Sequence, residues 1–393
     1  MVMKKLLFVL LLLSLAAMGL AACTNGAQTT AAHTTALPVM DTTAAQTTAA
    51  PNTDTVTTPK QTASETSASL PATTPEDTSA PLADTTPAVT AVMTTTPETT
   101  AVVTTAVVTT APITYTAENF MIAIDDKTPL SMIALPGTHD SGATKDMILS
   151  GTAKCQTMTI AEQLSAGVRY FDIRLRREDG ALHVYHGTVD QDLTFAEVLD
   201  AFYNFLDKNP SEALIVCIKE ETDATGTNDA FDTMVKNALS ANAAKWYTGS
   251  AIPTLGSVRG KCVLWRRFAT SSSYGFDASH DFADNSRDFT ITNGAYKLRA
   301  QDYYQNDSGD AKWEAVEAFL AVMAKPSANT YYLNNTSGYK PGSFGIPNIN
   351  TIKNHVNPLL LTYLEAKPSL VGIIATDFMT AEIAEAIYSL NFN

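Results

Sequence analysis

Residues 131–144 read SMIALPGTHDSGAT. The apolar start of this stretch is typical of a buried strand, and Pro136 and Gly137 interrupt the apolar pattern. His139 and Asp140 follow at once, so two titratable side chains stand together where the predicted strand ends. A histidine beside a carboxylate indicates proton-transfer chemistry, and the rest of such a site must come from other segments of the chain.

Short apolar runs recur after this stretch and predict further strands. They are VRYFDIRLR (168–176), LHVYHG (182–187), EALIVCIKEE (212–221), CVLWRRF (262–268), YKLRAQDYY (296–304), TYYLNNTSG (330–338) and LVGIIATDF (370–378). Amphipathic stretches lie between several of them, most clearly at 192–210, where apolar residues recur at three-four spacing before Asn209 and Pro210. Two more are 310–325 and 380–393. Continuous apolar strands that alternate with helices predict a mainly parallel sheet covered by helices.

Polar residues follow nearly every predicted strand at its carboxyl end. In chain order they are His139 and Asp140, Asp172 and Arg174, His186, Lys219, Arg267, Asp302, Asn334 and Asp377. The carboxyl ends of the strands of a parallel barrel share one face, which is the face that carries the active site. Histidine, arginine, lysine and aspartate gathered at one mouth suit a phosphate ester that carries a polyol.

One segment departs from a regular barrel. Only a few residues separate the predicted strands 168–176 and 182–187, and Asp179–Gly180 between them is typical of a turn. This spacing predicts a hairpin, which is antiparallel. His186 must return to the mouth if it belongs to the same site.

The first 23 residues do not belong to the predicted barrel. Lys4 and Lys5 precede an apolar run that ends in LAAC at 20–23, which is the pattern of a secretory signal. This ending resembles the lipobox of bacterial lipoproteins, a family in which the signal is cut before the cysteine and the cysteine carries the lipid. We therefore expect residues 1–23 to be a signal peptide and lipobox, and Cys23 to be the site of lipidation. The mature protein would be anchored to a bacterial cell membrane, with its catalytic domain on the extracytoplasmic side.

Residues 24–113 consist almost entirely of Thr, Ala, Pro, Val and Ser and contain no aromatic residue. Such a segment has too few large apolar side chains to offset the entropy of ordering, so we expect a disordered linker. The remaining residues, 114–393, show no second linker, and their length fits one α/β barrel.

Charge and cysteine content narrow the function further. The chain has 393 residues and a net charge of −14, which makes nucleic acid an unsuitable partner. Cys155, Cys217 and Cys262 form no CxxC pair and are interpreted as structural residues. We expect the protein to be a monomer.

Several of these blocks together resemble a known family. LPGTHDSG, GVRYFDIRLR, LHVYHG and NPSEALIVCIKEE are similar to the catalytic X region of bacterial phosphatidylinositol-specific phospholipase C. The resemblance continues through LWRRF, QDYY, YLNNTSG and IIATDF, so it covers residues 114–393 and none of the linker. It implies a distorted, incompletely closed TIM-type (β/α) barrel.

The resemblance also implies an activity. Members of the family cleave phosphatidylinositol by attack of the inositol 2-hydroxyl on phosphorus, which gives diacylglycerol and inositol 1,2-cyclic phosphate. Glycosyl-phosphatidylinositol anchors and free glycerophosphoinositol present the same head group. By the resemblance, His139 is the general base supported by Asp377, and His186 is the general acid assisted by Asp140. Arg174 contacts the phosphate.

The inositol ring has its own set of residues by the resemblance. Lys219, Arg267, Asp302 and Tyr304 match those that bind the ring, with Tyr304 stacking on its face. Arg266 is the alternative to Arg267, because an error of one strand position would move the side chain to the opposite face. Arg174 stands where eukaryotic relatives hold Ca²⁺, so we expect an enzyme without a metal or other cofactor.

Some neighbouring residues are given structural roles. Asp172 is interpreted as a partner for a nearby arginine or lysine, and Asn334 as a structural hydrogen-bonder. Glu220 and Glu221 could bind a cation or face solvent on a loop, and the second is expected. His183 is placed on a strand face away from the site.

Two alternatives to the lyase stay open at this point. One is another phosphodiesterase on the same barrel, such as a glycerophosphodiesterase, although those enzymes usually need a metal. The other is a surface-displayed barrel that binds an inositol lipid or glycan without catalysis. The presence of both a predicted acid and a predicted base favours the enzyme.

Overall fold

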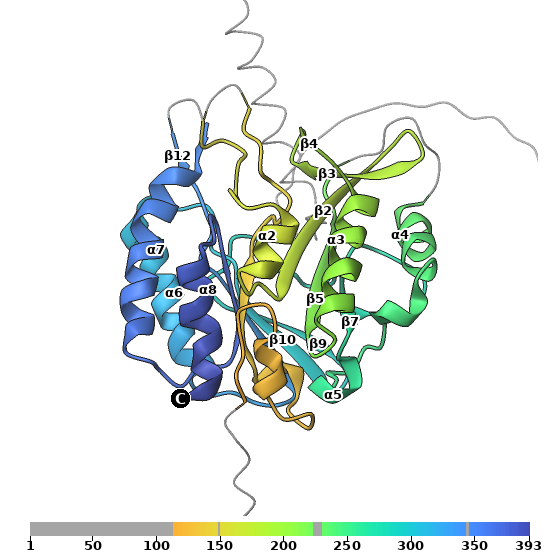
Figure 1. Ribbon diagram of the computed structural model, residues 1–393. Helices are drawn as coiled ribbons and strands as arrows, with labels where there is room; N and C mark the ends of the chain where they lie inside the picture. Colours follow the sequence, from red (N-terminus) through yellow and green to blue (C-terminus); the bar gives the residue numbers. More distant parts are fainter. Residues whose placement is uncertain (1–112, 148–149, 223–229, 343–345) are drawn as a thin grey trace, which may run out of the picture. The chain divides into compact units, whose positions relative to one another are not determined.

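Seven parallel strands form the frame of the protein (Figure 1). The computed structural model describes residues 113–147, 150–222, 230–342 and 346–393. Cys23, the signal and nearly all of the predicted linker lie outside these residues. The seven strands are β1 (Ala134–Thr138), β2 (Tyr170–Glu178), β5 (Ala213–Glu220), β7 (Lys261–Arg267), β10 (Tyr296–Gln301), β11 (Thr330–Asn335) and β14 (Gly372–Thr376). All seven correspond to apolar runs that predicted strands.

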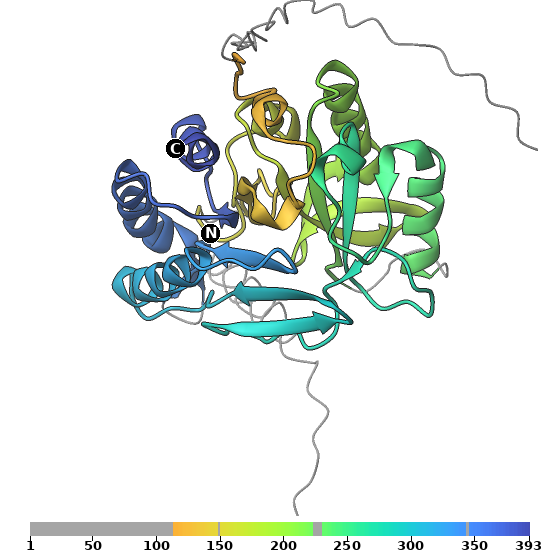
Figure 2. The ribbon, with the colours of Figure 1, turned by 90° about the horizontal axis from the view of Figure 1, so that it is seen from below.

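The sheet is curved but does not close within the part of the chain that the structure describes. Its main path is β6-β7-β5-β2-β1-β14-β11-β10-β9, with β8 paired to β7. The added strands are β6 (Trp246–Tyr247), β8 (Phe276–Asp277) and β9 (Phe289–Asn293), and β9 is antiparallel to β10. No ladder joins β8 to β9 among these strands, and Figure 2 shows the arrangement from below. The prediction of a distorted, incompletely closed barrel is confirmed.

Alternation along the strands separates the interior of the barrel from its outer face. Tyr170 on β2, Trp265 on β7 and Tyr331 on β11 point inward and meet, with the Trp265 ring 5.6 Å from Tyr170 and 4.7 Å from Tyr331. Residues of the opposite parity, such as Phe171 and Leu264, belong to the outer core beneath the helices. The apolar interior therefore fills the barrel below the ends of its strands and leaves those ends for polar residues.

Helices cover the outer face of much of the sheet (Figures 1 and 2). They are α2 (Ile160–Ser165), α3 (Phe195–Lys208), α4 (Phe231–Ser240), α5 (Leu255–Val258), α6 (Gly309–Met323), α7 (Ile349–Glu365) and α8 (Ala381–Tyr388). Capping boxes begin α2 at Thr159 with Glu162 and α3 at Thr194 with Glu197. Helix α3 ends at Lys208, just before Asn209 and Pro210, as the sequence predicts. No helix in the described residues is both long and apolar enough to cross a bilayer.

The predicted hairpin is present. β2 pairs antiparallel with β3 (Ala181–His186), which in turn pairs with β4 (Val189–Thr194). Asp179 and Gly180 make the turn with φ angles of 46° and 81°, in the left-handed region. The hairpin rises above the sheet at the top of Figure 1 and carries His186 at the end of β3.

The described chain enters on the opposite face of the barrel. Tyr115 stacks on Phe392 near the carboxyl terminus, with ring centroids 4.2 Å apart. The buried guanidinium of Arg169, just before β2, donates to the carbonyls of Ala117 and Glu118 and pairs with Glu212, just before β5. Residues 115–118 therefore lie at the amino ends of the strands. We call this face the rear and the carboxyl-end face the mouth.

Candidate active site

Strand register brings the first predicted pair together. Thr138 on β1 and Thr376 on β14 are partners in the parallel ladder, so the residues that follow them, His139 and Asp377, lie side by side. Nδ1 of His139 is 2.9 Å from Oδ1 of Asp377. Backbone angles turn sharply just beyond both residues, since Asp140 has φ 43° and Phe378 has φ 51°. These left-handed positions cost of order 1 kcal/mol or more each in a residue other than glycine.

The other ring nitrogen of His139 meets a cation. Nη2 of Arg174 lies 2.6 Å from Nε2 of His139, so the ring is held between a carboxylate and a guanidinium. Burial and Arg174 both lower the pKa of His139, but the Asp377 carboxylate outweighs them and the net effect is a raised pKa. An N–H donor at Nε2 and a carboxylate at Nδ1 together suit a neutral ring that carries its proton on Nδ1.

Three carboxylates surround Arg174. Asp172 accepts from its Nε and Nη2 at 3.0 and 2.9 Å, Asp140 is 3.3 Å from Nη1, and Glu221 is 3.7 Å from Nη1. Burial would lower the pKa of Arg174, but these three charges raise it well above its ordinary value. The same guanidinium contributes to holding the pKa of Asp172 far below the usual range despite burial. Asp172 is thus the structural partner that the sequence predicts.

His186 returns to the mouth, as the hairpin interpretation requires. Its Nε2 is 3.6 Å from Oδ2 of Asp140, and its Nδ1 is 2.5 Å from the carbonyl oxygen of Ala153. Both nitrogens face acceptors, which suits a ring protonated on both. The Asp140 side chain is fully buried, and neither of its oxygens has a hydrogen-bond partner among the described residues. Burial raises the pKa of Asp140 although Arg174 and His186 oppose the rise.

The segment 150–156 completes this corner of the mouth. The Asp146 carboxylate accepts backbone N–H bonds from Gly151, Thr152, Ala153 and Lys154, with donor–acceptor distances of 2.8–3.2 Å. These bonds lower the pKa of Asp146, although burial opposes the change. They also fix the Ala153 carbonyl that faces His186. Nε2 of Gln156 donates to the carbonyls of His139 and Thr376, which ties the segment to β1 and β14.

Register also aligns the cations of three neighbouring strands. Arg174 on β2 is the partner of Lys219 on β5, and Lys219 is the partner of Arg267 on β7. The guanidinium of Arg267 stacks on Phe282, 3.7 Å from the ring centroid. Arg266 has the opposite parity and is buried against Asp277 and the carbonyl of Phe268. The structure therefore places Arg267, rather than Arg266, on the face of the mouth.

Asp302 and Tyr304 lie across the open seam of the sheet from Lys219 and Arg267. Asp302 follows β10 and accepts from Nδ2 of Asn335 at 3.1 Å. The Tyr304 hydroxyl donates to Asp284 at 2.7 Å, and its carbonyl accepts from the backbone N–H of Tyr339. Gly338, next to Tyr339, donates to Oδ2 of Asp377. This backbone connection joins the Tyr304 side of the mouth to the His139–Asp377 pair.

Asn334 has the structural role that the sequence predicts, because its side chain bonds to Gln301 and to the carbonyl of Val316 inside the protein.

The prediction for Glu221 was wrong. Its side chain is 6% exposed, accepts from Nζ of Lys219 at 2.6 Å and from the N–H of Gly187 at 2.9 Å, and lies in the site. Lys219 and Arg174 lower its pKa to about 2 against the effect of burial. Glu221 is two residues beyond Lys219, and this period of two was the signal that placed it on the inner face.

Lys312 on α6 was also missed. It is fully buried and donates to Oε1 of Gln301 at 3.1 Å and to the carbonyl of Tyr303 at 2.7 Å, beneath Asp302. Burial lowers its pKa to about 7, against the field of Asp302 and Asp377. The sequence signal was its position on the buried stripe of α6, three and four residues before Ala315 and Val316.

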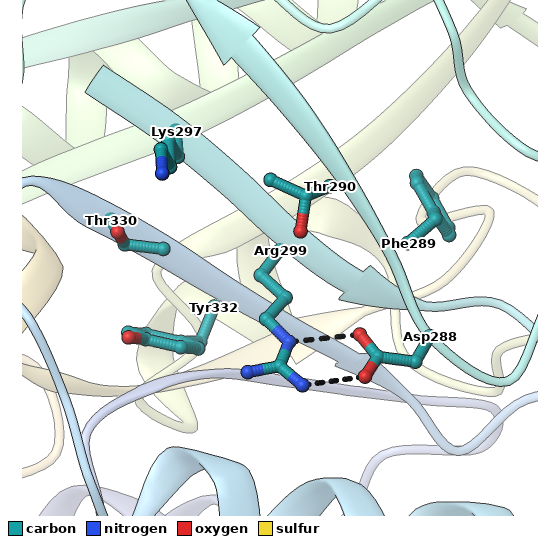
Figure 3. Close-up of a pocket in the computed structure, with 7 residues that line it drawn as sticks. All are labelled: Asp288, Phe289, Thr290, Lys297, Arg299, Thr330 and Tyr332. Atoms are coloured by element: carbon teal, nitrogen blue, oxygen red, sulfur yellow. Dashed lines mark hydrogen bonds and ion pairs between the residues drawn. The ribbon is translucent and has the colours of Figure 1, made fainter. Parts of the chain in front are cut away.

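A surface hollow of roughly 440 Å³ is separate from the mouth (Figure 3). Its lining includes Lys297, Arg299 and Tyr332, which lie on the outer face of β10 and β11, where Tyr332 joins the outer core. Figure 3 shows the Arg299 guanidinium paired with Asp288. Its Nε and Nη2 donate hydrogen bonds of 2.9 and 2.6 Å to the two carboxylate oxygens. None of the predicted site residues lines this hollow.

The chain is similar in sequence to known enzymes. Residues 128–268 match the family described as phosphatidylinositol-specific phospholipase C, X domain. A 1-phosphatidylinositol phosphodiesterase of Staphylococcus aureus is 35% identical over 264 residues, which are 63% of this chain and 84% of the relative. An enzyme of the same name from Listeria monocytogenes is 29% identical over 290 residues, which are 70% of this chain and 86% of the relative.

Solved structures show the same fold over about 70% of this chain. A crystal structure of a Staphylococcus aureus phosphatidylinositol-specific phospholipase C variant matches with TM-score 0.63 and 29% identity, over 69% of this chain and 97% of that chain. The enzyme from Listeria monocytogenes matches with TM-score 0.58 and 27% identity, over 71% of this chain and all of that chain. Sequence and fold agree, and the chain belongs to the bacterial phosphatidylinositol-specific phospholipase C family.

Proposed function

We propose that the protein cleaves phosphatidylinositol by intramolecular attack of the inositol 2-hydroxyl, as a phosphatidylinositol diacylglycerol-lyase. One observation carries the proposal. The mouth holds two histidines in opposite settings, with a donor at Nε2 of His139 and acceptors at both nitrogens of His186. Such a pair provides a base and an acid at the same pH, on either side of one guanidinium.

His139 takes the proton in the first step. Asp377 holds the ring by Nδ1 and stabilises the imidazolium that forms. The substrate phosphate replaces His139 as the partner of Arg174, and this frees Nε2 to accept the proton of the 2-hydroxyl. The hydroxyl oxygen then forms a bond to phosphorus, and the bond from phosphorus to the diacylglycerol oxygen breaks.

His186 protonates the leaving oxygen. Before this step Nε2, which faces the carboxylate of Asp140, carries the proton to be transferred, and Nδ1 donates to the carbonyl of Ala153. Because His139 and His186 face different carboxylates, the site keeps two separate proton paths. The products are diacylglycerol and inositol 1,2-cyclic phosphate.

Arg174 neutralises the charge on the phosphoryl oxygens. A planar guanidinium offers several fixed donors, and Asp140, Asp172 and Glu221 hold this one in place before substrate arrives. In this proposal a fixed cation of the protein performs the task that a calcium ion performs elsewhere, so the reaction proceeds without a metal.

The inositol ring occupies the remaining part of the mouth. Lys219 and Arg267 hydrogen-bond ring hydroxyls from one side of the open seam, and Asp302 does so from the other. Tyr304 covers one face of the inositol ring, and the Tyr339 ring lies 6.0 Å from the Tyr304 ring. Glu221 takes part by holding Lys219.

The amino-terminal sequence indicates where in the cell the protein works. We propose that lipid on Cys23 anchors the protein to a bacterial cell membrane, that residues 24–113 act as a flexible linker, and that residues 114–393 work outside the cytoplasm. The support is the lysine, apolar and LAAC pattern at the start of the chain and the linker's composition. The monomeric state belongs to the same proposal.

Phosphorus NMR provides the decisive experiment. The segment 114–393 is incubated with phosphatidylinositol vesicles, and the signal of inositol 1,2-cyclic phosphate should appear before any acyclic inositol phosphate. Glycerophosphoinositol in a parallel sample tests the head group without a membrane. Direct release of inositol 1-phosphate, or no cleavage of either substrate, would overturn the proposal.

A further inference from the structure

A buried cysteine, Cys155, lies beside His186 in the corner of the mouth formed by residues 150–156. Cys155 is completely buried, and its Sγ is 3.9 Å from Nδ1 of His186 and 3.7 Å from the carbonyl of Ala153. The mechanism above uses no thiol. A free thiol between a histidine and two buried carboxylates is the type of group that binds thiophilic metal ions.

Two sets of potential ligands share this thiol. One set is Asp140, Cys155 and His186, and the other is His139, Cys155 and Asp377. In each set, every residue brings one ligand atom within 4.8 Å of the other two. Ligand atoms around tetrahedral zinc are about 3.3–3.8 Å apart, given bonds of roughly 2.0–2.3 Å. Separations of up to 4.8 Å therefore need to shorten by about 1–1.5 Å, a movement that two side chains share.

The contacts distinguish the two sets. Both ring nitrogens of His139 already have close partners, and one of these is the cation Arg174. In the other set, the buried oxygens of Asp140 have no hydrogen-bond partner in the described residues, although Oδ2 forms longer ion pairs with Arg174 at 3.3 Å and with His186 at 3.6 Å. Nδ1–H of His186 bonds to the Ala153 carbonyl, which leaves Nε2, 3.6 Å from Oδ2 of Asp140, for an ion. The thiol, which is 3.9 Å from Nδ1, then turns toward Nε2 to join the site. A backbone carbonyl on the second nitrogen is the usual support for a metal-binding histidine.

We propose that Asp140, Cys155 and His186 bind a thiophilic divalent cation such as Zn²⁺, and that the bound ion inhibits cleavage. The ion displaces two protons to solvent, one from the thiol of Cys155 and one from Nε2 of His186, and it binds the thiolate and the freed lone pair of Nε2. The proposed general acid then has no proton to give, and Asp140 is neutralised. The inhibitory half of this proposal rests on the proposed function, whereas the binding half does not.

Binding is tested with Co²⁺, because cobalt in a zinc site gives a spectrum of its own. The sample is the segment 114–393, since the matched Staphylococcus aureus chain is a solved structure of which 97% is covered by 69% of this chain. A thiolate-to-cobalt charge-transfer band in the near ultraviolet should appear at one equivalent and vanish with excess Zn²⁺. Cys155→Ala should abolish the band, and Cys262→Ala, at a buried cysteine in the outer core, should keep it. Absence of the band from the wild type would overturn the proposal.

Two histidine variants identify the ligand set without any activity measurement. His186→Asn should weaken Co²⁺ binding by at least tenfold, and His139→Asn should leave it unchanged within about twofold. The reverse result would move the ion to the other set and contradict the proposal. These spectra remain informative if the Cys155→Ala variant does not fold.

Inhibition is measured separately on phosphatidylinositol. Wild type and Cys262→Ala should lose activity with added Zn²⁺ and regain it with EDTA, while Cys155→Ala should cleave equally with or without Zn²⁺. Equal inhibition of Cys155→Ala would contradict the assignment. A wild-type protein that binds Co²⁺ but does not cleave the lipid in EDTA would refute the proposed function and leave the metal site standing.

Discussion

Nη2 of Arg174 lies 2.6 Å from Nε2 of His139, the ring nitrogen that a base at this position must use. In the proposed mechanism, the phosphate-binding cation therefore covers the base in the free protein. A substrate phosphate would draw the guanidinium away and uncover Nε2 in the same event. The proposal thus couples proton abstraction to correct placement of the phosphate.

His139→Ala and His186→Ala should each reduce cleavage of phosphatidylinositol by about 10²–10⁴-fold, because each removes a proton-transfer group. Initial rates at saturating substrate measure the loss, and far-ultraviolet circular dichroism checks the fold. His183→Ala is the matched control, since His183 is on the same strand as His186. Near-normal rates in either site variant would refute the assignment.

The acid limb of kcat/KM against pH should have its midpoint above 6.5, the ordinary value for histidine. His139 must be neutral to act, and its pKa is raised in the protein, so activity rises as pH passes that higher pKa. Asp377→Asn removes the charge that raises the pKa, and the midpoint should fall. Asp190→Asn, at an exposed aspartate on β4, should not move it. An unmoved midpoint in Asp377→Asn would show that another group controls this limb.

Arg174→Ala should lower the rate by about 10²–10³-fold, the usual effect of removing a preorganised donor to a developing negative charge. Arg177→Ala, on the same strand but paired with Glu220, should change it little. Wild-type activity should survive excess EDTA and should not rise with Ca²⁺. Turnover that depends on calcium would contradict the proposed role of the guanidinium.

Glu221→Gln should raise KM for the inositol substrate about 10-fold or more, because loss of a charge-assisted hydrogen bond costs about 1.5–3 kcal/mol and Lys219 loses its anchor. Glu220→Gln is the control on the opposite face, where the partially exposed pair with Arg177 contributes less. Steady-state kinetics on glycerophosphoinositol separate KM from kcat without a membrane. Similar KM values for both variants would return Glu221 to a solvent-facing role.

Lys312 should make stability depend on pH above neutrality. Its pKa is about 7 in the folded protein and near 10.5 when unfolded, so the unfolded state binds more protons between these values. The free energy of unfolding should rise with pH in this window, by up to about 1.4 kcal/mol per unit from this group. Lys312→Met should remove that slope, whereas Lys325→Met, at an exposed lysine just after α6, should retain it. Urea titrations at several pH values provide the measurement.

The sequence predicted the strands and their polar ends because both depend on local patterns. Apolar runs of five to nine residues with a charged residue at the end were visible at His139, Lys219 and Asp377 without knowledge of the pairing. Register was not visible, since it depends on contacts between distant segments. The choice between Arg266 and Arg267 depends on the direction of Trp265. This ring points into the barrel, and Arg267, two residues later on the same strand, faces the same way.

For Glu221 and Lys312, the local sequence pattern does indicate a buried position. Glu221 shares the inward parity of Cys217 and Lys219, and Lys312 stands on the apolar stripe of its helix. Cys155 had no such signal. It lies outside the helices and strands, and its proximity to His186 arises from the bonds of Asp146 to residues 151–154, which no periodic pattern records.

The rear entry of the chain gives the enzyme a polarity. Tyr115 packs against Phe392 at the amino ends of the strands, while His139 and His186 open at the carboxyl ends. The chain that precedes residue 113 therefore joins the barrel on its rear, opposite the mouth. With the proposed lipid anchor on Cys23, the attachment would be on the face that does not bind substrate. Substrate on a second membrane or in solution could then reach the mouth without passing the linker.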